Sequence, residues 1–319
     1  MQRVQLGKTD LIVSRICFGC WQLSPRFWGD ISQEEWWKAA RTAVDRGINF
    51  IDTANAYGDG LAESVLGEFL EKEGLRDETV VATKFYWNIE AEERHPDTRY
   101  EYILSECEAS LKRLKTDRID LYQMHSWDPL TRPDEVAAAI GRLKKEGKIR
   151  WFGVSNLNPE QMRMYSNHLD IETLQPPYSL LNREIERHEL PHCLGKRIGT
   201  LVFSPLFRGL LSGKYGKDDT FDDFRKSDPL FHGPGFHRIL EGINELQPIA
   251  ERHGLSIAQL AIRWVLTHPA VTCAILGVKK PEHIETILPA AEDALPHADW
   301  HAAAGIMNKA LREARAAAT

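Results

Sequence analysis

Residues 119–156, IDLYQMHSWDPLTRPDEVAAAIGRLKKEGKIRWFGVSN, contain one complete unit of the pattern that decides the fold. The runs at its two ends are rich in branched and aromatic residues, as expected of strands. Between them, Pro133 stands where a helix can begin, apolar residues recur at helical spacing, and Gly147 follows the last turn. The unit therefore predicts a strand, a helix and a second, parallel strand.

The same alternation continues from about residue 16 to residue 290. The strand-like runs are ICFGCW (16–21), FIDTA (50–54), TVVATK (79–84), IDLYQMH (119–125), IRWFGVSN (149–156), ETLQPPY (172–178), GTLVFSP (199–205) and VTCAILG (271–277). Their continuous apolar character is typical of parallel strands covered on both faces. Eight such strands, each followed by helical sequence, predict an α/β fold, a single (β/α)8 TIM barrel domain spanning residues 1–319. A doubly wound parallel sheet is the alternative.

Further segments lie outside this alternation. VQLGKTDLIVSRI (4–16) predicts an N-terminal β-hairpin, turning at Gly7 to Asp10, that would plug one end of the barrel. A long loop follows the seventh strand and includes KYGKDDTFDDFRKSDPLFHGPG (214–235); a loop of this length is commonly functional. Helical sequence is also expected at 237–253, 256–267 and 298–318.

The composition excludes several classes of protein. The 319 residues include 40 basic and 46 acidic side chains, a net charge of −6, which argues against a protein that coats nucleic acid or anionic membranes. No apolar stretch is long enough to span a bilayer, and the first residues lack the apolar core of a secretory signal. Five cysteines without a disulfide framework favour a reducing, cytoplasmic location.

Side chains capable of acid–base chemistry stand at the C-terminal ends of three consecutive predicted strands. Asp52 ends the second strand, and Tyr57 follows it in a loop. Lys84 ends the third strand and His125 the fourth. Taken singly, Asp52 is explained as a loop-capping carboxylate, Lys84 as a solvated strand end and His125 as a core histidine. Because a barrel gathers these strand ends around one mouth, their joint occurrence favours an active site.

The chemistry of this set suits reversible protonation of a carbonyl oxygen. The pKa of a free phenol is near 10, too high for easy proton exchange at neutral pH. A neighbouring ammonium stabilises the phenolate and lowers that pKa, while a carboxylate keeps the ammonium charged and in place. An imidazole nearby can donate a hydrogen bond to the substrate oxygen.

Longer motifs resemble the aldo-keto reductase superfamily over essentially the whole chain, and most closely the bacterial branch that includes potassium-channel β subunits. They are GINFIDTANAYGDGLAESVLG (47–67), Lys84 in VVATKF, LKRLKTDRIDLYQMH (111–125), GKIRWFGVSN (147–156), LQPPYSLLNRE (174–184) and SPLFRGLLSGKY (204–215). The resemblance implies a catalytic tetrad, with Tyr57 as general acid in reduction and general base in oxidation. Lys84, paired with Asp52, would lower the pKa of Tyr57, and His125 would orient the carbonyl.

The resemblance also implies a nicotinamide cofactor, although no Gly-x-Gly-x-x-Gly fingerprint follows a strand. Ser155, Asn156 and Gln175 would hydrogen-bond the carboxamide, and Phe203 would stack on the ring. The positions implied around the pyrophosphate are Ser204, Leu206, Arg208 and Lys214. Trp21 would lie beside both cofactor and substrate, and Trp87 beside the substrate.

The adenosine end decides the choice between the two dinucleotides. Gly277, Lys279 and Lys280 resemble the segment that holds a 2′-phosphate, and Arg225 is a second candidate. This cationic cluster favours NADP(H) over NAD(H), although a solvated basic turn is the plainer interpretation. Relatives place Gln, and later Glu–Asn, after this segment; here the positions read His283, Thr286 and Ile287. The departure leaves the preference between NADP and NAD open.

Two other motifs carry less weight, and we assign no metal site. Cys17 and Cys20 form Cys-x-x-Cys, but on a strand they point to opposite faces. His188 and His192 have helical metal-ligand spacing with Cys193 adjacent, yet a solvated helix face explains them. Aromatic residues crowd the predicted mouth, namely Trp21, Phe27, Trp28, Tyr86, Trp87 and Trp127. They suit lipophilic carbonyls or sugars.

We therefore expect an NADP(H)-dependent oxidoreductase that interconverts an aldehyde or ketone and its alcohol by direct hydride transfer. The alternatives are an NAD(P)+-dependent sugar or polyol dehydrogenase, a slow cofactor-binding regulatory subunit, and a different barrel enzyme such as a phosphate-ligand isomerase. His125 speaks against the regulatory subunit, because channel β subunits lack histidine there. The expected partner is a small carbonyl or alcohol, with no nucleic acid or membrane. The physiological substrate, the direction and the oligomeric state stay open.

Overall fold

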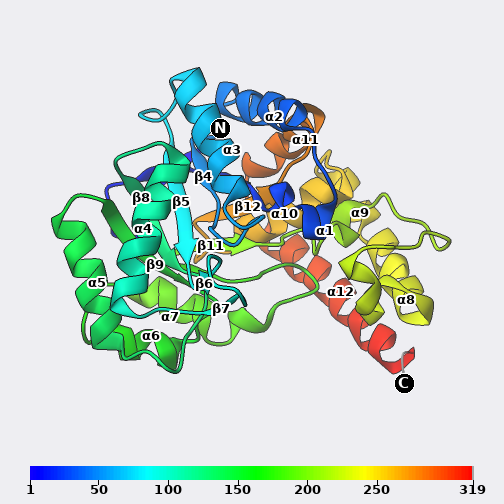
Figure 1. Ribbon diagram of the computed structural model, residues 1–319. Helices are drawn as coiled ribbons and strands as arrows, with labels where there is room; N and C mark the ends of the chain where they lie inside the picture. Colours follow the sequence, from blue (N-terminus) through cyan, green and yellow to red (C-terminus); the bar gives the residue numbers. More distant parts are fainter. Residues whose placement is uncertain (318–319) are drawn as a thin grey trace.

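The computed structural model describes residues 1–317 and contains a closed barrel of eight parallel strands (Figure 1). In order around the barrel they are β3 (Ile16–Gly19), β4 (Phe50–Asp52), β5 (Val80–Phe85), β8 (Ile119–Met124), β9 (Ile149–Ser155), β10 (Thr173–Gln175), β11 (Gly199–Phe203) and β12 (Cys273–Gly277). The last strand pairs with the first, with Ala274 opposite Ile16 and Gly277 opposite Gly19. The predicted (β/α)8 TIM barrel is confirmed, and the doubly wound alternative is wrong.

Helices surround the barrel, each burying one apolar face against it. They are α2 (Gln33–Asp45), α3 (Leu61–Glu73), α4 (Tyr100–Leu114), α5 (Pro133–Lys145), α6 (Pro159–Ser166), α7 (Glu189–Lys196), α10 (Ile257–Thr267) and α11 (Pro281–Ile287). Caps follow the sequence signals. The Ser32 side chain accepts from the Glu35 N–H, and Ser256 forms a full capping box with Gln259.

A further layer lies beside the barrel. The short helix α1 (Pro25–Trp28) follows the first barrel strand, and α8 (Gly233–Glu245), α9 (Gln247–Arg252) and α12 (His297–Ala317) follow later in the chain. Helices α8 and α12 lie side by side in Figure 1, and a Cβ on Gly242 would clash with Ala310. Residue 318 of the predicted tail helix lies outside the described residues.

The N-terminal hairpin closes one end of the barrel, as predicted. Strands β1 (Arg3–Gln5) and β2 (Ile12–Ser14) pair antiparallel. Leu6 and Leu11 from the turn are buried in the same apolar cluster as Phe50 and Leu121 from the barrel strands. Because this end is plugged by side chains, the opposite end is the one left for a site.

Several boundaries differ from the sequence-based expectation. Strand β10 stops at Gln175 because the following Pro176 and Pro177 have no N–H to continue a ladder. The helix expected over 237–253 is two helices, α8 and α9, that meet at Leu246. A small hairpin, β6 (Trp87–Asn88) with β7 (His95–Pro96), was not predicted. Among the described residues, no helix is long and apolar enough to cross a membrane.

Candidate active site

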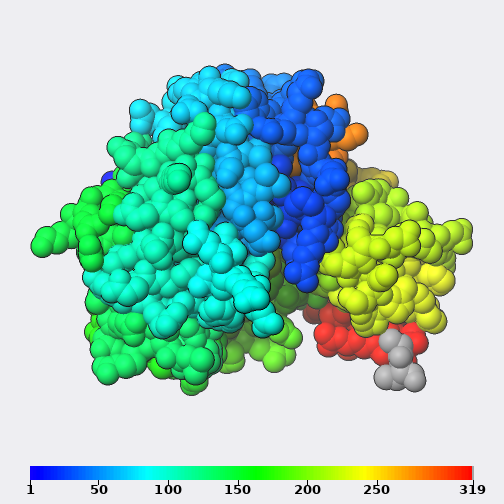
Figure 2. All heavy atoms as spheres, viewed as in Figure 1, coloured from blue at the N-terminus to red at the C-terminus, as the bar shows by residue number. Residues whose placement is uncertain are grey.

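The barrel places the predicted site residues at one end, around the C-terminal ends of its strands. Figure 2 shows the surface hollowed between the cyan hairpin segment and the yellow-green segment that follows β11, with the dark-blue segment around α1 on the rim. The site residues at or directly after strand ends are Asp52, Lys84, His125, Ser155, Asn156, Gln175, Phe203, Ser204 and Gly277.

Lys84 is the centre of the predicted tetrad and is fully buried. Its Nζ donates to Asp52 Oδ1 at 2.6 Å, to the backbone oxygen of Thr53 at 2.7 Å and to Tyr57 Oη at 3.4 Å. An ammonium group has three hydrogens, so every one has an acceptor. Burial opposes the charged form, but the interactions with Asp52 and Tyr57 together outweigh it and the pKa of Lys84 is raised. The group therefore remains a cation.

Asp52 is held from three strands. Its Oδ1 accepts from Lys84, and its Oδ2 accepts from Gln175 Nε2 at 2.8 Å and from Gln123 Nε2 at 3.2 Å. A buried ion pair is stable only when its remaining lone pairs are satisfied. Gln123 was not anticipated from the sequence, because it lies inside the β8 run and resembles any polar residue of a strand.

Tyr57 lies in the loop after β4 and faces Lys84 and His125. Its N–H bonds to the Ala54 oxygen, which closes a turn, and its ring meets His125 edge-on at 5.9 Å. Burial raises the pKa of Tyr57 above that of a free phenol and Lys84 offsets this only in part, so the expected net lowering of that pKa is not found. The phenol is consequently protonated at neutral pH and can donate that proton.

His125 directly follows β8, and its backbone N–H donates to the backbone oxygen of Phe85. Burial, reinforced by the positive charges of Lys84 and Arg94, holds the pKa of His125 well below its ordinary value. The imidazole is therefore neutral and has one N–H to donate. Its Nδ1 is buried and has no partner among the described residues.

The depressed pKa of His125 predicts a loss of stability in acid. In the unfolded chain, His125 is protonated below about pH 6.5, whereas in the folded protein it stays neutral. The free energy of unfolding therefore decreases as the pH is lowered below that value. Replacing His125 by Asn removes this pH-dependent contribution to stability. In urea denaturation, the free energy of unfolding of the variant minus that of the native protein should increase by about 1–2 kcal/mol when the pH is lowered from 7.5 to 5. A constant difference at both pH values would contradict a neutral buried imidazole.

The predicted carboxamide-binding residues form one connected group next to the tetrad. Asn156 Nδ2 donates to the His125 backbone oxygen and to Ser155 Oγ, both at 3.0 Å. Ser155 Oγ donates to the Gln175 backbone oxygen at 2.7 Å. Asn156 has a left-handed backbone with φ of 60°, a conformation that Asn tolerates well. The three side chains are therefore fixed by protein contacts.

The segment after β11 has an irregular backbone. Ser204, Phe207 and Arg208 all have positive φ, and such turns orient N–H groups towards anions. The Arg208 guanidinium is ion-paired with Asp228 and lies over the Phe207 ring at 4.6 Å. Ser212, not singled out from the sequence, has a buried Oγ without a partner in the described chain.

Positive charge gathers between this segment and β12. The cations are Lys214, Arg225, Lys279 and Lys280. Within residues 1–317, only Arg225 has a carboxylate partner, Asp223 at 2.6 Å. Burial together with the nearby Arg225 and Lys214 lowers the pKa of Lys279, which indicates a cluster with uncompensated charge. Gly277 fits closely here, because a Cβ would lie 1.7 Å from the Gln22 amide.

The residues that replace the expected adenine contacts are not equivalent in the structure. Ile287 is buried in the core and cannot reach a ligand. His283 is exposed, and its Nδ1 accepts from the Lys279 N–H at 3.5 Å. Thr286 is exposed and its hydroxyl donates to the Glu282 oxygen. Only His283 and Thr286 therefore remain on the surface.

The aromatic residues divide into two groups. Trp21, Phe27 and Trp28 pack with Phe224 of the long loop, with ring centroids 5.3–5.7 Å apart. This contact attaches the long loop to the segment that follows the C-terminal end of β3. Phe224 was not predicted, because residues so far apart in sequence give no sign of their contact.

Trp87 lies across the mouth, in the hairpin β6–β7. Its backbone oxygen accepts from Asn55 Nδ2 at 2.9 Å and from Tyr102 Oη at 2.5 Å. Asn55 is fully buried and lies two residues before Tyr57. The hairpin is thereby attached to the loop that carries the phenol.

The discounted motifs take no part in the site. Cys17 lies in the apolar cluster inside the barrel, whereas Cys20 packs in the outer one. His188 precedes α7 as its N-cap, and His192 lies within the helix. No group of three or more potential metal ligands occurs in the described part of the chain.

This arrangement is that of a nicotinamide-dependent barrel oxidoreductase, and comparison with known proteins gives the family. Residues 15–307 match the Aldo/keto reductase family, so the chain belongs to it and is an NAD(P)H-dependent aldo-keto reductase. The alternative of an unrelated barrel enzyme is wrong.

Three relatives illustrate the range of the family. Aldo-keto reductase YhdN of Bacillus subtilis is 39% identical over 90% of this chain and 88% of its own. The NADH-specific methylglyoxal reductase of Escherichia coli is 31% identical over 94% and 96% of the two chains. The solved glycerol dehydrogenase AKR11B4 of Gluconobacter oxydans is 34% identical, covers 97% and 96%, and superimposes with a TM-score of 0.90.

Proposed function

We propose that this protein reduces an aldehyde or ketone to its alcohol with NADPH, and that Tyr57 transfers the proton. The observation that carries the proposal is the buried Lys84 ammonium, which donates to Asp52 and to Tyr57 at once. This geometry couples a permanent cation to the oxygen that must lose a proton. It is the arrangement that general acid–base catalysis on a carbonyl needs.

Each residue of the tetrad has a separate task in this proposal. Tyr57, protonated because it is buried, donates its proton to the carbonyl oxygen as the alcohol forms. Lys84 stabilises the phenolate left behind, and Asp52 keeps Lys84 charged and oriented. His125, neutral at the working pH, donates a hydrogen bond that orients the carbonyl without competing as an acid.

The residues present fit a nicotinamide dinucleotide, which would supply the hydride when bound. Ser155, Asn156 and Gln175 would hold the carboxamide, and Phe203 would lie against the ring. Lys214 and the unpartnered Ser212 hydroxyl would face the pyrophosphate. Because Arg208 is committed to Asp228, we give it a structural role in shaping the loop, with its backbone next to the phosphates.

Preference for NADPH rests on charge. The cations near β12 lack enough carboxylate partners, and a 2′-phosphate would supply the missing negative charge. Burial, and after it the charge of Arg225, lowers the pKa of Lys279, so these two residues are the candidates to bind that phosphate. The NADH-specific relative shows that members of the family differ in this choice.

A second candidate is the reverse reaction, the oxidation of a polyol. The similarity to a protein titled glycerol dehydrogenase favours it. A panel of aldehydes and polyols, assayed by absorbance at the nicotinamide wavelength with NADPH, NADH and their oxidised forms, tests both candidates. Aldehyde reduction faster with NADPH than with NADH supports the proposal. Turnover confined to polyols would favour the second candidate, and turnover of neither class would reject both.

A further inference from the structure

Arg94 stands on the rim of the candidate active site, in the loop that joins β6 and β7. Its guanidinium lies over the Trp87 ring, with Cζ 4.9 Å from the ring centroid. One nitrogen donates to Asp59 Oδ1 at 3.1 Å. Asp59 is two residues beyond Tyr57, so Arg94 bridges the phenol-bearing loop and the hairpin. About a third of its side chain is exposed, at 33%.

Most of the hydrogen-bonding capacity of Arg94 is unused. A guanidinium has five N–H donors in a planar fork, and Asp59 is its one hydrogen-bond acceptor within residues 1–317. The other acidic residues of the same loop, Glu90, Glu92 and Glu93, are exposed, and none is ion-paired with Arg94. The edge of the fork is therefore available to an anion, and its planar, paired donors match the two oxygens of a carboxylate.

The position of Arg94 relates it to the reacting groups. Its guanidinium donates to Asp59, two residues after Tyr57, and Trp87 beneath it accepts from Asn55, two residues before Tyr57. The backbone beneath it is held in place, because the Trp87 backbone oxygen accepts from both Asn55 and Tyr102. A cation held between the β6–β7 hairpin and the loop that carries Tyr57 is placed to bind the far end of a substrate rather than the cofactor.

We propose that Arg94 binds the carboxylate of an anionic carbonyl substrate, so that the enzyme prefers an oxo acid to the neutral aldehyde of the same length. This inference rests on the proposed function and adds a substrate class to it. Arg94 would be a specificity-determining residue. Asp59 would compete with the substrate for the guanidinium. Loss of the Arg94 charge should therefore lower the preference for the anionic substrate, and loss of the Asp59 charge should raise it.

The test compares succinic semialdehyde with butanal, which has the same four carbons and no carboxylate. In Arg94→Gln the ratio of the two kcat/KM values, acid over neutral, should fall about tenfold, mainly through KM, since a charge-assisted contact at a partly exposed site is lost. In Asp59→Asn the same ratio should rise. Raising the ionic strength should lower the ratio in the native enzyme and leave it unaltered in Arg94→Gln.

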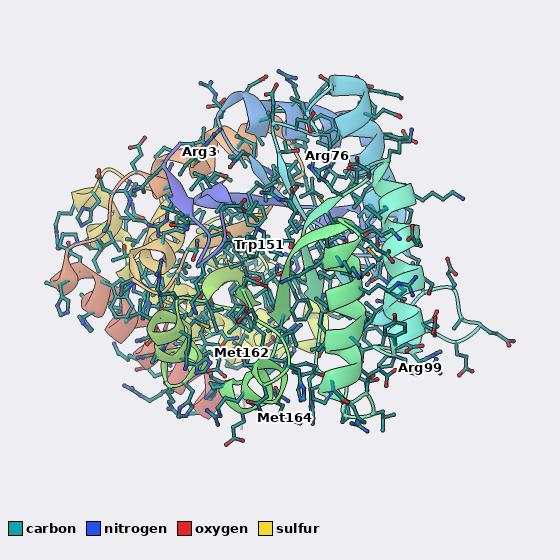
Figure 3. The ribbon with its side chains drawn as sticks, turned by 90° about the vertical axis from the view of Figure 1, so that its left-hand side faces the viewer. Arg3, Arg76, Arg99, Trp151, Met162 and Met164 are labelled. Atoms are coloured by element: carbon teal, nitrogen blue, oxygen red, sulfur yellow. The ribbon has the colours of Figure 1, made fainter. Side chains whose placement is uncertain are left out.

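The matched control is Arg99→Gln. Arg99 is an exposed arginine at the start of α4 (Figure 3), and it is ion-paired with Asp97. Its loss should leave the ratio unchanged. A ratio that does not respond to Arg94→Gln, while butanal is reduced, would overturn the inference and leave the proposed function standing. If neither these two aldehydes nor any other carbonyl of the substrate panel were reduced, the proposed function would be rejected instead.

A binding measurement tests the inference about Arg94 independently of the proposed function. Succinate, which cannot be reduced, should change tryptophan fluorescence through Trp87, and its Kd should rise about tenfold in Arg94→Gln but not in Arg99→Gln. Equal affinity in all three proteins would overturn the inference whatever the enzyme turns over.

Discussion

Replacing Tyr57 by Phe should lower kcat for carbonyl reduction by about 10²–10⁴-fold. The ring and its packing against His125 are retained, and the transferable proton is lost. No other hydroxyl accepts a hydrogen bond from Lys84 in the described residues, so no neighbouring group can take over. Steady-state turnover, together with fluorescence titration of NADPH, measures the loss.

Cofactor affinity should stay the same in this variant, because the phenol is assigned to the proton and not to the dinucleotide. Tyr165→Phe is the matched control. Its hydroxyl is buried in α6 without a partner, so turnover should not change. Normal activity in Tyr57→Phe would remove the phenol from the mechanism.

Lys84→Met should reduce both activity and stability. Asp52 would be left as a buried carboxylate without its cation, and breaking one side of a buried pair costs about 3–5 kcal/mol of unfolding free energy. Turnover should fall at least about a hundredfold, as expected when proton transfer loses its stabilising charge. Urea denaturation and steady-state kinetics measure the two effects.

The double variant Lys84→Met with Asp52→Asn separates the two losses. Neutralising Asp52 should restore most of the stability, because no unpaired charge remains, whereas activity should stay low. Lys38→Met removes a lysine of an exposed surface pair with Glu34 and should leave stability almost unchanged. Full activity in the double variant would contradict the role given to the ammonium.

The barrel could be predicted because its signals are local. Apolar runs, helix punctuation such as Pro133, and turn glycines each act within a few residues, and parallel strands have to be covered on both faces. The grouping of the tetrad side chains could be predicted from the barrel, because its geometry brings the ends of β4, β5 and β8 together. The shorter β10 shows the limit of this approach, since two prolines outweighed an apolar pattern.

What escaped prediction depends on contacts between distant segments. Gln123 looks like any strand residue until the barrel turns it towards Asp52. Phe224 gains its role only when the long loop packs on Trp21. Arg94 likewise meets the loop that carries Tyr57 only through the hairpin and its contact with Asp59. Such side chains carry no periodic or local signal, so the three-dimensional structure is needed to find them.

The pH dependence of alcohol oxidation tests the role of the phenol most directly. In that direction Tyr57 must accept a proton, and burial keeps its pKa high, so kcat/KM should rise with pH as the phenolate forms. In Tyr57→Phe, measured through its residual activity, the rising limb should disappear. A limb with the same midpoint in both proteins would assign the proton to another group and contradict the account.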